Sequence, residues 1–236
     1  MTTERIDGLD IFRGWAILFM VLYHFTYDLN HFHIISVNMN QATEFLISRY
    51  IIMTLFILGV GISLALVHKP YIRWRSVKKR LLLLGLASTL VSIATYIEFP
   101  NAWVYFGILH FILLSSILVL PFLSYPRVTL ALSIVILIGS FYDILNMHTT
   151  FNFLQPILHL PPLNTEDLVP LTPWFAVVLI GTLFVHYNLY KKFFNLPIFS
   201  VNFLPNSVLK FMGQNSLVIY LIHQPILFLS FMLFLK

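Results

Sequence analysis

Residues 11–32 read IFRGWAILFMVLYHFTYDLNHF, an almost continuous apolar run that holds an arginine, two histidines and an aspartate. A helix needs about 20 mostly apolar residues to cross a hydrocarbon core of about 30 Å. The run therefore predicts a membrane-spanning helix. Its ionisable residues are costly in lipid, so they call for a functional explanation.

The rest of the chain repeats this pattern. Hydrophobic residues make up 59% of the 236 positions and charged residues 10%, too few to cover the surface of a soluble domain. Short loops join the apolar runs, and no small-residue cleavage site follows the first run, so we expect no removable signal peptide. We expect an all-α, polytopic membrane helix bundle that forms one domain over residues 1–236, with about seven transmembrane helices, at 11–32, 45–68, 79–98, 103–123, 127–146, 170–190 and 207–235.

The loop charges predict the orientation. Basic residues that resist translocation crowd the loop at 69–80, which should therefore lie in the cytoplasm. Alternation then places the N-terminus inside and every lysine and arginine except Arg49 and Lys236 on the cytoplasmic side. We expect a multi-pass protein of a bacterial cytoplasmic (inner) membrane.

The basic loop also allows two interpretations. It can serve topology and contact with anionic lipid, or it can bind a phosphorylated cytoplasmic ligand. The net charge of +5 follows from the cytoplasmic cations, so no nucleic-acid partner is expected. The chain has no cysteine, which excludes disulfides, thiolate catalysis and cysteine-bound metal.

Polar groups follow one face of the first predicted helix. At 100° per residue, an arc of about 60° contains Asp10, Arg13, His24, Asp28 and His31. Ionisable groups at membrane depth usually face a cavity or pathway. Arg13 and His24 are about 16 Å apart along the axis, so an elongated ligand could contact both.

Two pairs within this stripe have the spacing of neighbours on a helix. Asp28 lies one turn after His24 and could orient its ring as a general base. Asp10 and Arg13 could form an ion pair at the cytoplasmic edge. The alternatives are a structural cap and salt bridge for Asp10 and Arg13, and an interhelical polar pair or a proton path for His24 and Asp28.

The stripe also carries a family resemblance. The opening from Arg5 to His24 resembles heparan-α-glucosaminide N-acetyltransferase-like membrane proteins and the wider transmembrane acyltransferases, which share an arginine and a histidine separated by ten residues. Arg13 and His24 have this spacing. Further similar runs are FILGVGIS (56–63), GILHF (107–111), TPWF (172–175) and GQNSLVIYLIHQP (213–225), so the resemblance covers most of the chain.

The resemblance implies transfer of an acetyl group from cytoplasmic acetyl-CoA to a sugar amine or hydroxyl across the membrane. It implies an acetyl-CoA-dependent N- or O-acetyltransferase whose acceptor is an amino sugar or an envelope glycan. The chain is shorter than the lysosomal enzyme, so that enzyme's substrate is not carried over. The oligomeric state is left open, with a homodimer as one candidate.

Polar residues on other predicted spans supplement this site. His110 could polarise the thioester or form a structural hydrogen bond, and Arg80 of the basic loop could assist Arg13 with the CoA phosphates. His223 and Gln224 could contact the acceptor, with interhelical packing as the alternative. Trp174 is either an interfacial anchor or a sugar-stacking platform.

These residues predict one mechanism. Asp10 and Arg13 bind CoA with Arg80 and His110, and His24, oriented by Asp28, takes the proton of the acceptor. A covalent acetyl-histidine is the variant. No metal is expected, because no third ligand supports His31 and His33. The main alternative function is a proton-coupled transporter of a small polar solute, although the internal repeat usual in transporters is missing.

Overall fold

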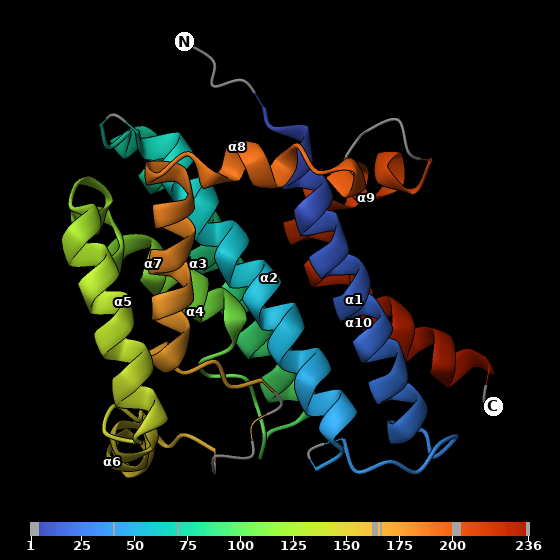
Figure 1. The fold of residues 1–236 in the computed structure, drawn as a ribbon. Coiled ribbons are helices and arrows are strands. Elements are labelled where there is room, and N and C mark those ends of the chain that lie inside the picture. The colour runs from blue at the N-terminus through green and yellow to red at the C-terminus, as the bar shows by residue number, and fades with distance from the viewer. Residues whose placement is uncertain are drawn as a thin grey trace. The chain divides into compact units, whose positions relative to one another are not determined.

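The computed structural model describes residues 5–39, 41–69, 71–161, 165, 167–199 and 204–234 (Figure 1). Every regular element in this part of the chain is a helix, as the sequence predicted. Lys236, expected on the outer side, lies outside the described residues. The helices are α1 (Asp7–His31), α2 (Thr43–His68), α3 (Trp74–Glu98), α4 (Ile108–Leu118), η1 (Leu120–Ser124), α5 (Pro126–Phe141), α6 (His148–Leu158), α7 (Leu171–His186), α8 (Leu189–Phe194), η2 (Pro197–Phe199), α9 (Leu204–Gln214) and α10 (Ser216–Phe234).

Helix length distinguishes the elements that match a bilayer. Among the described residues, α1, α2, α3 and α10 are the four helices long and apolar enough to cross a membrane. The predicted spans at 103–123, 127–146 and 170–190 correspond to the shorter apolar helices α4, α5 and α7. The architecture is that of a helical membrane protein, but the expected count of seven is not reproduced. Each of these three predicted spans also contains residues outside an α-helix, so α4, α5 and α7 are shorter than the spans.

The last predicted span is divided in two. Hydropathy predicted one helix over 207–235, whereas the structure ends α9 at Gln214 and begins α10 at Ser216. Between them, the Asn215 side-chain amide donates to the carbonyl of Phe211 at 2.9 Å. The backbone amide of Asn215 also donates to this carbonyl at 3.1 Å, and the amide of Ile219 donates to the carbonyl of Asn215 at 3.0 Å, so backbone hydrogen bonds continue across the junction. The division leaves the second part, α10, as the membrane-spanning helix.

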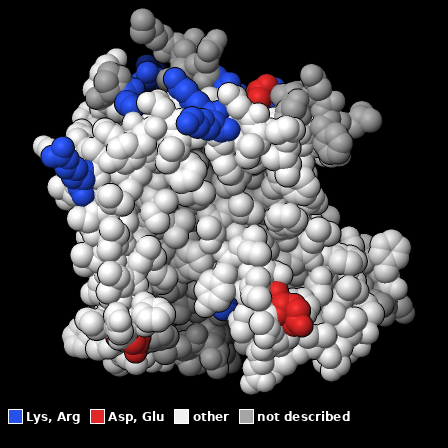
Figure 2. Space-filling model, in the orientation of Figure 1, with Lys and Arg blue, Asp and Glu red and all other residues white. Residues whose placement is uncertain are grey.

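The surface fits a lipid environment. Most of the face in Figure 2 carries neither acidic nor basic side chains. On α3 the large apolar side chains of Leu82, Leu86 and Ile97 are 66–73% exposed. Such a surface is costly in water but favourable against acyl chains. We conclude that the protein is an integral membrane protein.

The described chain packs into two compact units, Met1–Gly59 with Leu189–Lys236, and Val60–Asn188. In the first unit, α1 packs against α9 and α10. Ile17, Met20 and Ile52 form a core that is extended by side chains of α9 and α10. The single-domain organisation remains a prediction.

Glycine lets α1 and α9 approach at backbone distance. A Cβ at Gly14 would overlap the carbonyl group of Leu209, and a Cβ at Gly213 would overlap the carbonyl oxygen of Asp10. The two glycines also face each other, because the Gly213 Cβ would lie 3.0 Å from the amide nitrogen of Gly14. This crossing fixes α9 against the N-terminal part of α1 and positions the polar groups described below.

In the second unit, α3 packs on α4 and α5 packs on α7. Gly61 on α2 adjoins the carbonyl oxygen of Val178 on α7, where a Cβ would overlap it. The absence of a side chain at Gly61 lets α2 and α7 pack at backbone distance. At the start of α4, the amide of Ile108 donates to a carboxylate oxygen of Asp167 at 3.0 Å.

Candidate active site

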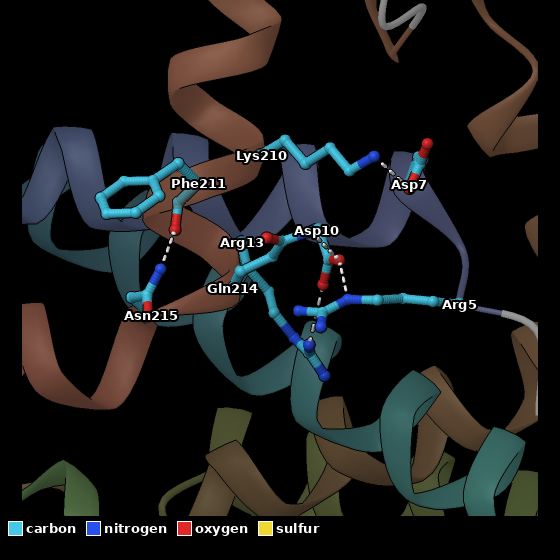
Figure 3. A network of polar contacts seen from close by, with 8 residues as sticks. All are labelled: Arg5, Asp7, Asp10, Arg13, Lys210, Phe211, Gln214 and Asn215. Atoms are coloured by element: carbon cyan, nitrogen blue, oxygen red, sulfur yellow. Dashed lines mark hydrogen bonds and ion pairs between the residues drawn. The ribbon is translucent and has the colours of Figure 1, made fainter.

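A buried carboxylate organises the N-terminal end of α1 (Figure 3). Asp10 is 2% exposed. It pairs with Arg5 and, at 3.4 Å, with Arg13, and the Gln214 side chain of α9 donates to it at 3.4 Å. The ion pair expected between Asp10 and Arg13 is confirmed. A carboxylate is an acceptor only, so these donors compensate its burial and limit the directions in which Arg13 can point.

A second ion pair supports the same end of the site. Lys210 of α9 lies 2.7 Å from a carboxylate oxygen of Asp7 in the first turn of α1. Figure 3 shows both ion-pair groups where α9 lies on α1. The sequence pattern did not indicate Arg5, Gln214 or Lys210 as partners of α1. The resemblance of 213–225 to the family was the available signal, but it does not specify a register between helices.

The other end of α1 contacts α10. Asp28 is fully buried and accepts a hydrogen bond of 2.8 Å from the side-chain amide of Gln224. The rings of His24 and His223 lie edge to face, with centroids 4.9 Å apart. The sequence-predicted residues His24, Asp28, His223 and Gln224 therefore gather in one cluster, which we call the His–Asp cluster.

The hydrogen bonds of the cluster differ from the simplest expectation. Asp28 was expected to orient His24, but its hydrogen bond goes to Gln224 on α10. In the described part of the chain, no hydrogen bond joins Asp28 to His24. Orientation of His24 by Asp28 therefore stays a prediction. The titratable side chain whose ring contacts His24 from α10 is His223.

Several atoms of the cluster can still accept hydrogen bonds. Three side-chain atoms of the cluster are buried and have no hydrogen-bond partner among the described residues. They are Oδ2 of Asp28, Oε1 of Gln224 and Nε2 of His223. Buried polar atoms without partners are costly and uncommon in proteins. A ligand or side chain that supplies hydrogen-bond donors would relieve this cost, which suits an amine or hydroxyl acceptor.

His110 is held by local structure in the second unit. Its Nδ1 accepts from the amide of Gly107 at 3.2 Å, and its Nε2 lies 3.1 Å from Oγ of Ser92. The Ser92 hydroxyl in turn donates to the carbonyl of Val104 at 2.7 Å. Both ring nitrogens therefore have protein partners, which favours the structural alternative for His110.

We expect His110→Ala to lower the free energy of unfolding by about 1–3 kcal/mol, because it leaves the buried amide of Gly107 without an acceptor. Thermal unfolding of the purified protein measures the effect, and Ser92→Ala should lower stability in the same direction. A purely structural role predicts unchanged binding of acetyl-CoA, whereas the cofactor role predicted from the sequence predicts weaker binding. A loss of turnover at unchanged stability would instead support a role in polarising the thioester.

Arg80 and Trp174 also lie in the second unit. Arg80 donates from Nε to the hydroxyl of Ser116 at 3.0 Å. Trp174, at the start of α7, is 6% exposed. This burial leaves little indole surface for an interfacial anchor or a sugar platform. The cofactor role of Arg80 and the substrate role of Trp174 remain predictions.

No group of three His, Asp or Glu side chains in the described ranges could hold a metal ion. The expectation that the reaction needs no metal stays a prediction. The chemistry available at the His–Asp cluster is that of imidazole, carboxylate and amide groups, which can transfer protons and hydrogen-bond an acceptor.

The apolar helices and the polar cluster buried between α1 and α10 define a helical membrane protein with an intramembrane polar site. In a comparison with protein families, residues 5–225 match the family described as heparan-alpha-glucosaminide N-acetyltransferase, catalytic. The chain belongs to this family. Comparisons with curated proteins and with solved structures give no match. The family assignment identifies the chain as a membrane acetyltransferase, and acetyltransferases of this type use acetyl-CoA as the donor.

Proposed function

We propose that the protein transfers an acetyl group from cytoplasmic acetyl-CoA to a sugar amine or hydroxyl on the extracytoplasmic side. Arg13, held by Asp10, contacts CoA, and His24 takes the proton of the acceptor. In the form predicted from sequence, Asp28 orients His24, and Arg80 and His110 assist with CoA while His223, Gln224 and Trp174 contact the acceptor. An amino-sugar or envelope-glycan acceptor, a bacterial cytoplasmic membrane and a homodimer belong to the same proposal.

The observation that carries this proposal is the separation of two polar centres on α1. The Asp10–Arg13 pair occupies one end and the His–Asp cluster the other. The helical rise puts Arg13 and His24 about 16 Å apart. An extended acyl carrier with a phosphorylated end and a thioester end can use both centres at once, which a small polar solute cannot.

The orientation follows from charge. The basic loop at 69–80 favours the cytoplasm. If α1 and α2 each cross the membrane once, the start of α1 lies on the same side as this loop. Arg13 then lies near the side from which acetyl-CoA arrives. The His–Asp cluster lies deeper, toward the extracytoplasmic acceptor.

The function is tested with purified protein in lipid nanodiscs and acetyl-CoA labelled in the acetyl group. We expect saturable binding of acetyl-CoA and transfer of label to glucosamine or to another member of a panel of amino sugars and envelope glycans. Absence of any affinity for CoA would exclude the acetyltransferase proposal. Transport of a polar solute without acetylation would favour the alternative.

We expect Arg13→Ala to weaken acetyl-CoA binding by about 10- to 100-fold, because a hydrogen bond to a charged group contributes about 1.5–3 kcal/mol. Equilibrium binding of labelled acetyl-CoA measures the loss. Arg127→Ala, which removes an exposed cation at the start of α5, is the matched control and should bind normally. Equal affinities for Arg13→Ala and wild type would remove Arg13 from the CoA site.

A further inference from the structure

The proton position on His223 can be derived from its contacts. Its Nδ1 lies 2.6 Å from the carbonyl oxygen of Tyr220. A carbonyl oxygen only accepts, so Nδ1 must donate the hydrogen bond. In the neutral ring, Nε2 then holds a lone pair. That atom is buried and has no hydrogen-bond partner among the described residues.

The free nitrogen belongs to a ring in contact with His24. The two ring centroids are 4.9 Å apart, and the ring planes meet at 64°. A rotation of the His24 ring about its side-chain bonds would bring one of its N–H groups toward Nε2 of His223. The other nitrogen of His24 would then carry the lone pair that a general base requires.

Asp28 is engaged in a different contact. Its Oδ1 accepts from Gln224, the residue that follows His223 on α10. This bond fixes the rotation of α10 against α1 at the level of the two histidines. Asp28 thereby positions His223 through Gln224.

We propose that His223 is the positioning residue that orients His24 as the general base, the part that the sequence assigned to Asp28. The assignment rests on the acetyl-transfer function proposed above.

His24 removes a proton from the acceptor as the acceptor oxygen or nitrogen bonds to the acetyl carbon. The carbon–sulfur bond breaks, and the CoA thiolate takes up the proton released by His24. During the step, His223 accepts a hydrogen bond from the His24 imidazolium and stabilises its charge. Two adjacent imidazolium ions would repel each other, so the pair takes up at most one extra proton during the step.

The test compares two nucleophiles in the full-length protein in nanodiscs. Water needs a base to attack acetyl-CoA, whereas hydroxylamine attacks a thioester without one. Release of CoA is followed with a thiol reagent, to which the cysteine-free chain adds no signal. The rate of CoA release in the same mixture without protein is subtracted, because hydroxylamine also cleaves acetyl-CoA in solution. The variants are His223→Leu, His223→Gln and Asp28→Asn, with His186→Leu at the exposed end of α7 as the control.

We expect His223→Leu to lower kcat for the water reaction by about 100-fold or more, in the range of general base catalysis. The KM for acetyl-CoA and the hydroxylamine reaction should change little. His223→Gln, whose amide oxygen can accept from His24, should restore part of the loss. Asp28→Asn should lower kcat less than His223→Leu, and His186→Leu should behave as wild type.

Two results would overturn the assignment while leaving acetyl transfer intact. Equal losses with water and hydroxylamine in His223→Leu would show a purely structural role. A larger loss in Asp28→Asn than in His223→Leu would return the orienting role to Asp28. If the wild-type protein neither accelerates release of CoA over the protein-free mixture nor transfers label to any acceptor of the panel, acetyl transfer itself fails and the role of His223 falls with it.

Discussion

Replacement of His24 by alanine is expected to lower kcat for acetyl transfer by about 10²–10⁴-fold, the usual contribution of a positioned general base. The affinity for acetyl-CoA should remain, because Arg13, the α1 residue proposed to contact CoA, lies about 16 Å from His24 along the helix. Turnover of labelled acetyl-CoA with a sugar amine, measured beside equilibrium binding, separates the two effects. His33→Ala, an exposed histidine just beyond α1, is the control and should be fully active.

The same protein distinguishes direct from covalent transfer. Labelled acetyl-CoA is mixed with protein in the absence of acceptor, and the protein is separated and counted. Label on wild type that is missing from His24→Ala indicates an acetyl-histidine intermediate. An unlabelled wild-type protein that still transfers acetyl groups indicates direct attack. Full activity of His24→Ala would exclude His24 from both routes.

The second large effect concerns stability at the crossing of α1 and α9. We expect Gly14→Ala and Gly213→Ala each to lower the free energy of unfolding by at least about 1–3 kcal/mol, because the added methyl group overlaps backbone atoms that cannot move independently. Thermal unfolding in detergent or nanodiscs measures the change. Separation of α9 from α1 should also remove Gln214 from Asp10 and weaken binding of acetyl-CoA.

Gly85 on α3 provides the matched control, since a Cβ there meets nothing within 4 Å. Gly85→Ala should raise stability by about 0.5–1 kcal/mol through helix propensity alone. If the free energy of unfolding falls in Gly213→Ala and rises in Gly85→Ala, close packing at Gly213 is the cause of its loss of stability. Unchanged stability in both Gly14→Ala and Gly213→Ala would contradict the backbone contact.

The sequence predicted the helical class and the polar face of α1. Charged side chains are costly in lipid, so they gather on one face of a membrane helix, and this spacing is visible in the sequence. It could not predict the pairing of Asp28 with Gln224 or of His24 with His223. Those contacts depend on the register between α1 and α10, and that register follows from packing between segments distant in sequence.

The errors have similar physical causes. Hydropathy joined α9 and α10 into one predicted span, because apolar residues lie on both sides of Asn215. It also overestimated the length of the middle spans, where the helices are short. The role of His110 in binding CoA remains a prediction, and the structure adds that Gly107 and Ser92 supply the hydrogen-bond partners that a histidine in an apolar run needs.

The hydrogen bond between Asp28 and Gln224 joins residues 196 positions apart. During synthesis, α1 therefore enters the membrane before α10 has been made. Until then, Asp28 lacks the Gln224 amide that later compensates the burial of its carboxylate. The site closes only when α10 has been inserted, so contacts of high sequence separation form last. A nascent chain that lacks α10 is expected to contain the residues of α1 that are proposed to bind acetyl-CoA, but not the His24–His223 pair. An incomplete protein should therefore be catalytically inactive.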